Sequence, residues 1–274
     1  MSILILASPT DTTAIRVAYM LRQRLGATRV TVRTPEEIAL APVWHHEVST
    51  SMTSTFIRLH DGGTVERPRL IFNRVQQVES FPLGRSSQEA REFGQTEVSA
   101  LLLSWLHGEG CPVINRPSPS GLVGHCMRPL LWQRLAVRVG LPVLIGGATS
   151  STRRYPTQHP FTTHDHNGFA YLPRVNGFGY YSETSSSERS VVYVIGKRAM
   201  GNAPPQVANA CVRLAAMVGL ELLQVEFVRT SSAAQLPSFA GASPFVFSDD
   251  TSVIHSICDY LENRANSCPQ EGYS

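Results

Sequence analysis

The 274-residue sequence is poor in charge and in cysteine. Charged residues make up 16% of it, against the roughly 25% typical of soluble domains, and 24 basic against 21 acidic residues leave a net charge of +3. This composition is unlike that of a disordered chain, and it lacks the strong positive charge that is typical of a nucleic-acid-binding protein. The five cysteines are far apart and contain no CxxC pair, so neither a disulfide framework nor a structural zinc cluster is indicated.

Long hydrophobic runs and targeting signals are also missing. No apolar run approaches the ~20 residues that span a bilayer, and the first residues lack a basic region followed by a cleavage site. We therefore expect no membrane partner and a cytoplasmic location.

Several motifs of known chemistry are absent. The sequence has no GxGxxG after its first apolar run, no GxxxxGK[ST] and no GxSxG, so a dinucleotide site, a Walker-type phosphate site and a nucleophile elbow have no support. His159, His164 and His166 share a polar segment with Asp165, but no partner ligand stands at a defined spacing. We interpret them as solvated and expect neither a metal site nor a cofactor.

The sequence does contain an alternation of apolar runs and helical periodicities, which predicts an α/β fold. The pattern opens as strand, helix and strand, a unit whose two strands should be parallel. A strand at 53–59, a turn at 61–63 and a strand at 70–72 predict a hairpin or a tight strand pair. The other elements expected before residue 120 are strands at 2–7, 28–33 and 112–115 and helices at 14–25 and 87–108.

A polar stretch at residues 146–167 carries the main expected boundary. It is rich in glycine, serine, threonine, proline and histidine and has no apolar periodicity, which is typical of a long loop. A helix at 130–139 and a strand at 141–145 precede it. Strands at 191–195, 220–228 and 244–247 and helices at 204–218 and 250–263 follow it. We expect three segments: 1–120 with a parallel sheet, 121–167 as helix, strand and connection, and 168–274 as an α+β core.

Two Asn-Arg pairs each follow a buried strand. Asn73 and Arg74 end the apolar run at 70–72, and Asn115 and Arg116 follow the strand at 112–114. Parallel strands deliver their carboxyl ends to one edge, where open α/β sheets place ligands. We therefore take these four residues as a candidate ligand-binding site, with two guanidinium groups for a carboxylate or phosphate. Ordinary turn chemistry at a strand end is the alternative.

From these residues onward the chain resembles the ATP-grasp superfamily, especially the glutathione-synthetase-like and graspetide peptide ligases. The segments that are similar are Phe-Asn-Arg at 72–74, Gln-Glu-Ala-Arg-Glu at 88–92, Val-Ile-Asn-Arg-Pro at 113–117, residues 131–136, Gly-Leu-Pro-Val at 140–143, Val-Tyr-Val-Ile-Gly at 192–196 and residues 219–227. The resemblance implies a pre-ATP-grasp-like N-terminal domain with a parallel sheet, followed by a reduced ATP-grasp-like α+β domain. It also implies ATP-dependent activation of a carboxylate.

The chain departs from this family where the phosphates and Mg²⁺ are expected. The family's late Asp/Glu-x-Asn motif should fall between residues 227 and 247, yet residues 228–247 contain no acidic residue. Glu226 alone remains as a carboxylate ligand, and Arg189 stands two positions before the place of the family's arginine at Val191. The residues between 145 and 191 are too few for the family's antiparallel lid.

These observations favour a catalytically degenerate ATP-grasp-like protein that binds a peptide or a partner protein in a biosynthetic pathway. Two alternatives stay open. One is an active ATP-dependent carboxylate–amine ligase, either on its own or completed by a second subunit, and the other is a small-molecule binding protein. We expect no nucleic-acid partner, and a homo-oligomer is among the assemblies that the sequence allows.

Overall fold

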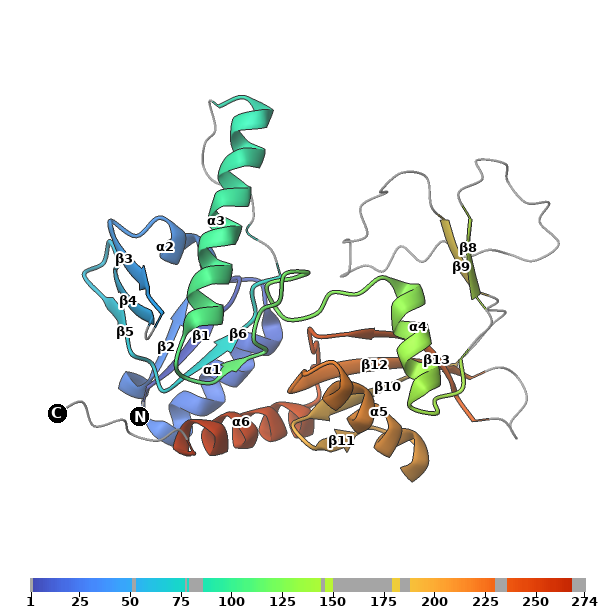
Figure 1. The fold of residues 1–274 in the computed structure, drawn as a ribbon. Coiled ribbons are helices and arrows are strands. Elements are labelled where there is room, and N and C mark those ends of the chain that lie inside the picture. Colours follow the sequence, from blue (N-terminus) through green and yellow to red (C-terminus); the bar gives the residue numbers. More distant parts are fainter. Residues whose placement is uncertain are drawn as a thin grey trace. The chain divides into compact units, whose positions relative to one another are not determined.

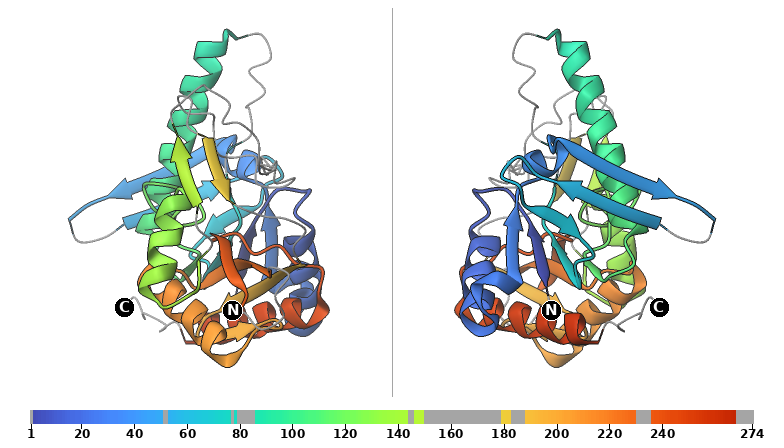
Figure 2. Two further views of the ribbon diagram at one scale, coloured as in Figure 1. Left: turned by 90° about the vertical axis from the view of Figure 1, so that its right-hand side faces the viewer. Right: turned by 90° about the vertical axis from the view of Figure 1, so that its left-hand side faces the viewer.

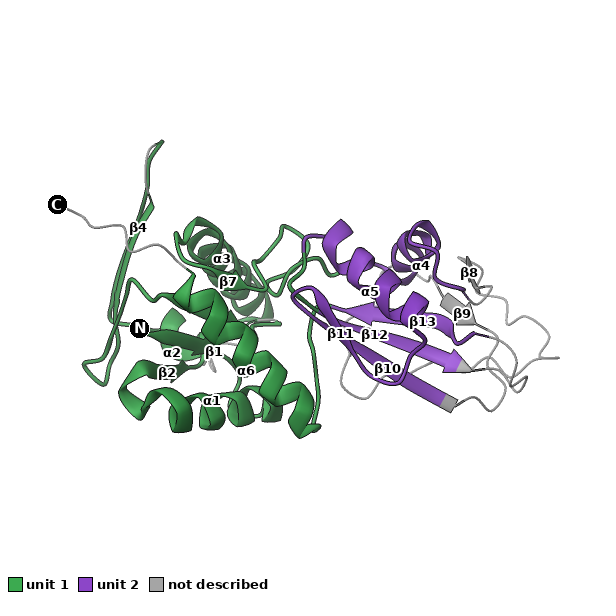
Figure 3. Cartoon of the chain, turned by 90° about the horizontal axis from the view of Figure 1, so that it is seen from below, with its two compact units in different colours: residues 1–126, 220–222, 244–274 green, residues 127–219, 223–243 purple. Residues whose placement is uncertain are grey.

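Two compact units divide the chain. The computed structural model describes residues 2–50, 53–76, 78, 86–143, 146–149, 179–182, 188–229 and 236–267. Unit 1 contains residues 1–126, 220–222 and 244–274, and unit 2 contains residues 127–219 and 223–243 (Figure 3). The expected segments 1–120, 121–167 and 168–274 stay a prediction, because most of residues 146–167 lie outside the described residues. Residues 220–222 and 244–267 pack within unit 1 although they follow that boundary.

A four-stranded parallel sheet forms the centre of unit 1 (Figure 1). Its order is β2-β1-β6-β7, and the strands are β2 (Val30–Arg33), β1 (Ile3–Leu6), β6 (Leu70–Asn73) and β7 (Val113–Ile114). Every residue of β1 and β6 is buried, which is why β1 and the first three residues of β6 are continuous apolar runs in the sequence. The predicted α/β class and parallel sheet are confirmed.

Helices cover both faces of this sheet, as Figure 3 shows. One face carries α1 (Thr12–Leu25), which packs against α6 (Thr251–Asn266). The other face carries α3 (Gln88–Gly108), whose Trp105 is fully buried against Leu4 and Leu6 of β1. Successive side chains of a strand point to opposite faces of the sheet, so Ile3 and Ile5 point to the face that α1 covers. The two helical layers close a core above and below the sheet.

A second, antiparallel sheet in unit 1 corrects the predicted hairpin. Its order is β3-β4-β5, with β3 (Val43–Val48), β4 (Thr53–Arg58) and β5 (Thr64–Glu66). The strand predicted at 53–59 is β4, and it pairs with β3 and β5 and not with residues 70–72. The three residues of β5 are too few to show a period of two, and β3 has three consecutive polar residues at 45–47, so neither strand has an alternating pattern in the sequence. A short helix α2 (Pro35–Ala39) with a Thr34–Glu37 capping box precedes this sheet.

Unit 2 contains a four-stranded sheet of order β11-β10-β12-β13, in which β10 pairs antiparallel with β11 and β12 pairs antiparallel with β13. The strands are β11 (Arg198–Met200), β10 (Glu188–Ile195), β12 (Leu222–Arg229) and β13 (Ser238–Ser243). Helices α4 (Pro129–Arg138) and α5 (Pro205–Met217) pack on it. A two-stranded sheet of β8 (Gly146–Thr149) and β9 (Gly179–Ser182) completes the described part.

Two strands predicted for the second half of the chain are wrong or untested. Residues 244–247 form no strand, and the strand lies just before them, in the Ser-Phe-Ala-Gly-Ala-Ser run of β13. Small residues with one aromatic give little strand signal, whereas Pro-Phe-Val-Phe has a high β propensity. In the predicted strand at 141–145, Val143 forms a single bridge with Phe239, and residues 144 and 145 lie outside the described residues.

No helix in the described part of the chain is long and apolar enough to cross a bilayer. The predicted cytoplasmic location stays a prediction. The three loop histidines and Asp165 lie outside the described residues.

Candidate functional site

The structure brings the two predicted asparagines together at the carboxyl edge of the parallel sheet. Asn73 ends β6 and Asn115 follows β7, and both are buried. The Asn73 amide donates hydrogen bonds to the backbone oxygens of Asn115, at 3.0 Å, and Leu122, at 2.6 Å. Its side-chain oxygen accepts from the Val75 N–H at 3.2 Å. The convergence expected from parallel strands is therefore present for this pair.

The Asn115 side chain ties two later segments to this edge. Its amide donates to the backbone oxygens of Leu222 and Pro244, both at 2.9 Å. Its oxygen accepts from the backbone N–H groups of Glu221, at 3.0 Å, and Leu222, at 2.9 Å. An asparagine side chain offers two donor hydrogens and two acceptor lone pairs, so these four hydrogen bonds use all of its capacity.

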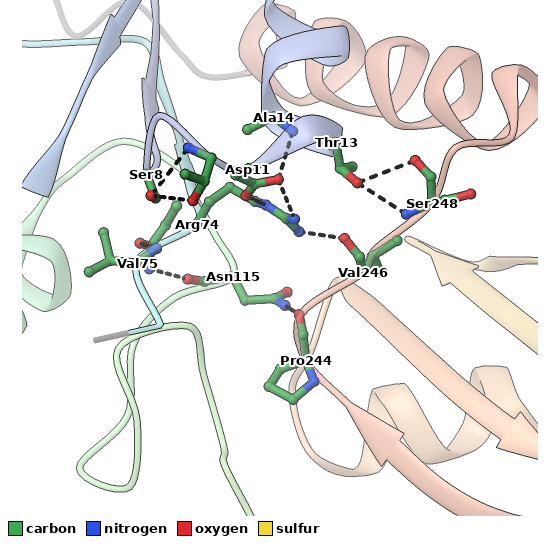
Figure 4. Close-up of polar contacts among 12 residues, drawn as sticks. Ser8, Asp11, Thr13, Ala14, Arg74, Val75, Asn115, Pro244, Val246 and Ser248 are labelled. Carbon is green, nitrogen blue, oxygen red and sulfur yellow. Dashed lines mark hydrogen bonds and ion pairs between the residues drawn. The ribbon is translucent and has the colours of Figure 1, made fainter. Parts of the chain in front are cut away.

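Arg74 is buried in an ion pair (Figure 4). Its Nε lies 2.7 Å from Asp11 Oδ2 and its Nη2 lies 3.0 Å from Asp11 Oδ1, a bidentate geometry. Its Nη1 donates to the Val246 oxygen at 2.6 Å, and the guanidinium lies 3.5 Å from the centre of the Phe245 ring. Burial lowers the pKa of Arg74, and the Asp11 carboxylate acts in the opposite direction. The group is held by unit 1 itself.

Arg116 has a different environment from Arg74. It is exposed, and its Nη1 donates to the His107 oxygen at 2.6 Å while its Nη2 donates to the Cys111 oxygen at 3.1 Å. These carbonyls belong to the last turn of α3 and the segment after it, where helix C-termini leave oxygens without partners. The two guanidinium groups therefore have separate structural partners. Binding of a ligand by Asn73, Arg74, Asn115 and Arg116 stays a prediction.

Sequence reasoning missed the partners that complete this edge. Asp11 caps α1 by accepting from the Ala14 N–H at 3.0 Å while it pairs with Arg74. Thr13 Oγ1 exchanges hydrogen bonds with the backbone of Ser248, accepting from its N–H at 3.0 Å and donating to its oxygen at 3.3 Å (Figure 4). A helix N-cap at Asp11 is a local signal. The contacts of residues 245–248 have none, because more than 170 positions separate them from Arg74.

The strand pair β12–β13 is the place to look for side chains that could bind Mg²⁺ and nucleotide phosphates. In the pairing register Glu226 faces Gly241 and Gln224 faces Ser243. Gln224 Nε2 donates to Glu226 Oε1 at 3.3 Å. Mg²⁺ takes carboxylate oxygens together with phosphates, and these two strands offer one carboxylate. One carboxylate is the smallest number that Mg²⁺ usually takes from a protein beside substrate phosphates. Among the described residues no group of three or more His, Cys, Asp or Glu side chains is placed to hold a metal.

No protein-family model and no curated protein matches this sequence. Solved structures do. The ligase PsnB, "complexed with phosphomimetic variant of minimal precursor, Mg, and ADP", is 17% identical over 96% of this chain and 98% of its own, with a TM-score of 0.69. The macrocyclase MdnC from Microcystis aeruginosa MRC, "bound with precursor peptide MdnA", is 12% identical over 96% and 100%, with a TM-score of 0.71. A RiPP-associated ATP-grasp ligase from Chryseobacterium gregarium is 10% identical over 98% and 100%, with a TM-score of 0.65.

These alignments extend over nearly the whole length of the similar chains. The predicted absence of the lid rests on residues between 145 and 191, most of which lie outside the described residues, so it stays a prediction. At this identity the likeness concerns the fold, and it agrees with the parallel sheet of unit 1 and the β12–β13 strand pair of unit 2. The chain has the fold of the ATP-grasp ligases.

Proposed function

We propose that this chain is a peptide-binding protein of a biosynthetic pathway, built on an ATP-grasp fold that no longer turns over ATP. The observation that carries the proposal is the β12–β13 strand pair, where the single carboxylate of Glu226 faces Gly241. The predicted acidic motif has no counterpart in residues 228–247.

Transfer of a phosphoryl group to a carboxylate needs the negative charge of the phosphates to be neutralised. Removing one preorganised electrostatic group typically lowers kcat by about 100- to 1000-fold. Here residues 228–247 contain no acidic residue, and Arg189 stands two positions before the place that the resemblance gives to the family's arginine. Losses of this kind together leave a fold without the activity.

The peptide part of the proposal comes from the similar structures. PsnB and MdnC were solved with precursor peptides, and the alignments with this chain cover 98% and 100% of their lengths. This similarity in length supports a peptide site in this chain as well.

Calorimetric titration of the full chain with Mg·ATP tests the loss of activity. We expect a dissociation constant weaker than about 10 μM, which corresponds to about −7 kcal/mol, and no ATP hydrolysis. The Glu226→Gln variant should behave like the wild type. Tight binding or hydrolysis that Glu226→Gln abolishes would establish the active-ligase alternative.

A displayed library of random linear peptides, selected on the full chain, tests peptide binding. We expect selected peptides to share a pattern, and a synthetic one to bind in calorimetry where its scrambled version does not. The binding should be the same with and without Mg·ATP. Failure to enrich any peptide, or binding that requires Mg·ATP, would contradict the proposal.

A further inference from the structure

A serine, a histidine and a threonine form a chain of hydrogen bonds in unit 1, where strands β3 and β4 lie alongside helix α3 (Figure 2). Ser104 belongs to α3, His46 to β3 and Thr55 to β4. The Nε2 atom of His46 lies 2.9 Å from Ser104 Oγ. Its Nδ1 atom lies 2.9 Å from Thr55 Oγ1. The imidazole ring therefore joins two hydroxyl groups that come from different elements.

Packed secondary structure holds the three side chains in place. His46 and Thr55 face each other in the β3–β4 register, and residues opposite each other in an antiparallel pair point to the same side of the sheet. Trp44, two residues before His46, points to that side as well. It packs edge to face on Trp105 of α3, with 5.6 Å between the ring centres. This contact fixes Ser104, the residue before Trp105, next to the imidazole.

The Ser104 hydroxyl differs from the other hydroxyl groups of α3. Thr96 and Ser99 each donate to the carbonyl oxygen four residues earlier, at 2.9 Å and 2.7 Å, which is the usual bond of such residues inside a helix. Ser104 instead meets the His46 ring. Its hydrogen is therefore available to a ring nitrogen.

The His46 ring is set up to accept that hydrogen. Burial, together with the charge of the neighbouring His45, lowers the pKa of His46, so the ring is neutral at pH 7. From β4 and α3 the ring faces the hydroxyls of Thr55 and Ser104, and His45 and Glu47 of its own strand point to the opposite side of the sheet. A neutral imidazole has one N–H group and one free lone pair. When Nδ1–H donates to Thr55, the lone pair of Nε2 points at Ser104.

We propose that Ser104 is a nucleophile that accepts acyl groups from activated esters and thioesters, with His46 as its general base and Thr55 as the residue that positions the ring. A nucleophile within hydrogen-bond reach of a base, which a third group orients, is the arrangement that activates a serine hydroxyl. Ser104 is exposed, so an acyl donor can reach it. The site uses none of the residues of the parallel-sheet edge or of the β12–β13 pair.

The acyl transfer needs only the chain and the donor. The Oγ atom of Ser104 bonds to the carbonyl carbon of the donor while its proton passes to His46 Nε2. The bond from that carbon to the leaving oxygen or sulfur then breaks. The leaving group departs with the bonding electron pair and takes the proton from His46. The products are a Ser104 ester and an alcohol or thiol, and nothing is oxidised or reduced.

Incubation of the full chain with p-nitrophenyl acetate, followed by peptide mass spectrometry, measures acetylation at each residue. Acylation of amines gives little background, because Lys197 is the single lysine of the chain. General-base assistance typically accelerates such a step by about 100- to 10 000-fold. We therefore expect Ser104 to be acetylated at least about 100-fold faster than Ser99 of the same helix. Acetylation of Ser104 that is no faster than that of Ser99 overturns the proposal.

Substitutions test the role of each partner. His46→Gln keeps a polar side chain but removes the base, and it should slow acetylation of Ser104 by about 100-fold. His45→Gln is the matched control on the opposite side of the strand and should keep the rate at pH 8, above the ordinary histidine pKa of about 6.5. Thr55→Val should slow the reaction about tenfold, the equivalent of one hydrogen bond, and Thr55→Ser should restore it. A His46→Gln variant with an unchanged melting temperature and the wild-type rate refutes the assignment of the base.

The pH profile of the wild-type chain tests the mechanism without any variant. The rate at Ser104 should follow the neutral fraction of His46, with a midpoint below the ordinary histidine pKa of about 6.5 and a plateau above it. His45→Gln should move the midpoint to higher pH, because it removes a positive charge beside the ring. A rate that rises steadily to about pH 9 without a plateau would mean an unassisted hydroxyl and would overturn the proposal. None of these measurements involves Mg·ATP or a peptide, so the outcome is independent of the proposed function.

Discussion

Replacing Arg74 by methionine should destabilise unit 1 strongly. Methionine keeps most of the length of the side chain and removes its charge. In the structure the change deletes two hydrogen bonds to Asp11 and one to the Val246 oxygen. The Asp11 side chain is 4% exposed, so water cannot replace the lost partner. Asp11 would keep only its bond from the Ala14 N–H.

The magnitude follows from the charge that is left behind. Removing one partner of a buried ion pair costs about 3–5 kcal/mol, because the other charge stays desolvated. The contact of the guanidinium with the Phe245 ring adds to the loss, since methionine offers no cation. We expect Arg74→Met to lower the free energy of unfolding by about 4 kcal/mol.

A double variant separates the charge from the packing. Asp11→Ser keeps an N-cap for α1 and, in the Arg74→Met background, removes the orphaned carboxylate. We expect Arg74→Met/Asp11→Ser to recover most of the lost stability. Urea unfolding followed by tryptophan fluorescence measures both, since Trp44 and Trp105, two of the three tryptophans, belong to unit 1. A loss below about 1 kcal/mol in Arg74→Met would refute the reasoning, and so would a double variant less stable than the single one.

Three further predictions concern the same unit. Asn115→Asp replaces two amide donors by a carboxylate that faces two carbonyl oxygens, and it should lower the free energy of unfolding by about 3 kcal/mol. Arg116→Ala should cost about 1 kcal/mol, seen as faster hydrogen exchange in the last turn of α3. Burial and the hydrogen bond to Glu221 raise the pKa of Tyr260. The stability from its neutral hydroxyl is therefore complete below its ordinary pKa of about 10 and is lost at higher pH. Urea titrations above pH 10 should show this decline in the wild type and a smaller one in Tyr260→Phe.

The sequence predicts elements whose signal is local and misses those whose cause is distant. Strands β1 and β6 are buried on both faces, so each is an apolar run that a reader can recognise. Strand β13 is made of small residues, and its place in the sheet depends on its pairing with β12. The local sequence gives no sign of that pairing, so the prediction placed the strand at 244–247.

The candidate site shows the same division. The Asn-Arg pairs can be read from the sequence because each follows an apolar strand, and the sheet does bring Asn73 and Asn115 together. Their partners could not be read. Arg74 meets a carboxylate 63 positions earlier and a carbonyl 172 positions later, and no periodicity connects such residues. The sequence therefore predicts where polar side chains gather, and only the structure shows which of them already have hydrogen-bond partners within the protein.

The discontinuity of unit 1 has a consequence for synthesis on the ribosome. The parallel sheet is complete once residue 114 has been made, but α6 and the backbone oxygens that receive Arg74 and Asn115 lie at residues 222–266. Until those residues emerge, the nascent chain holds a sheet with one helical layer unfinished and an ion pair open to water. Emergence of residues 244–266 should then be the step that commits unit 1 to its native state, with chaperones most needed just before it.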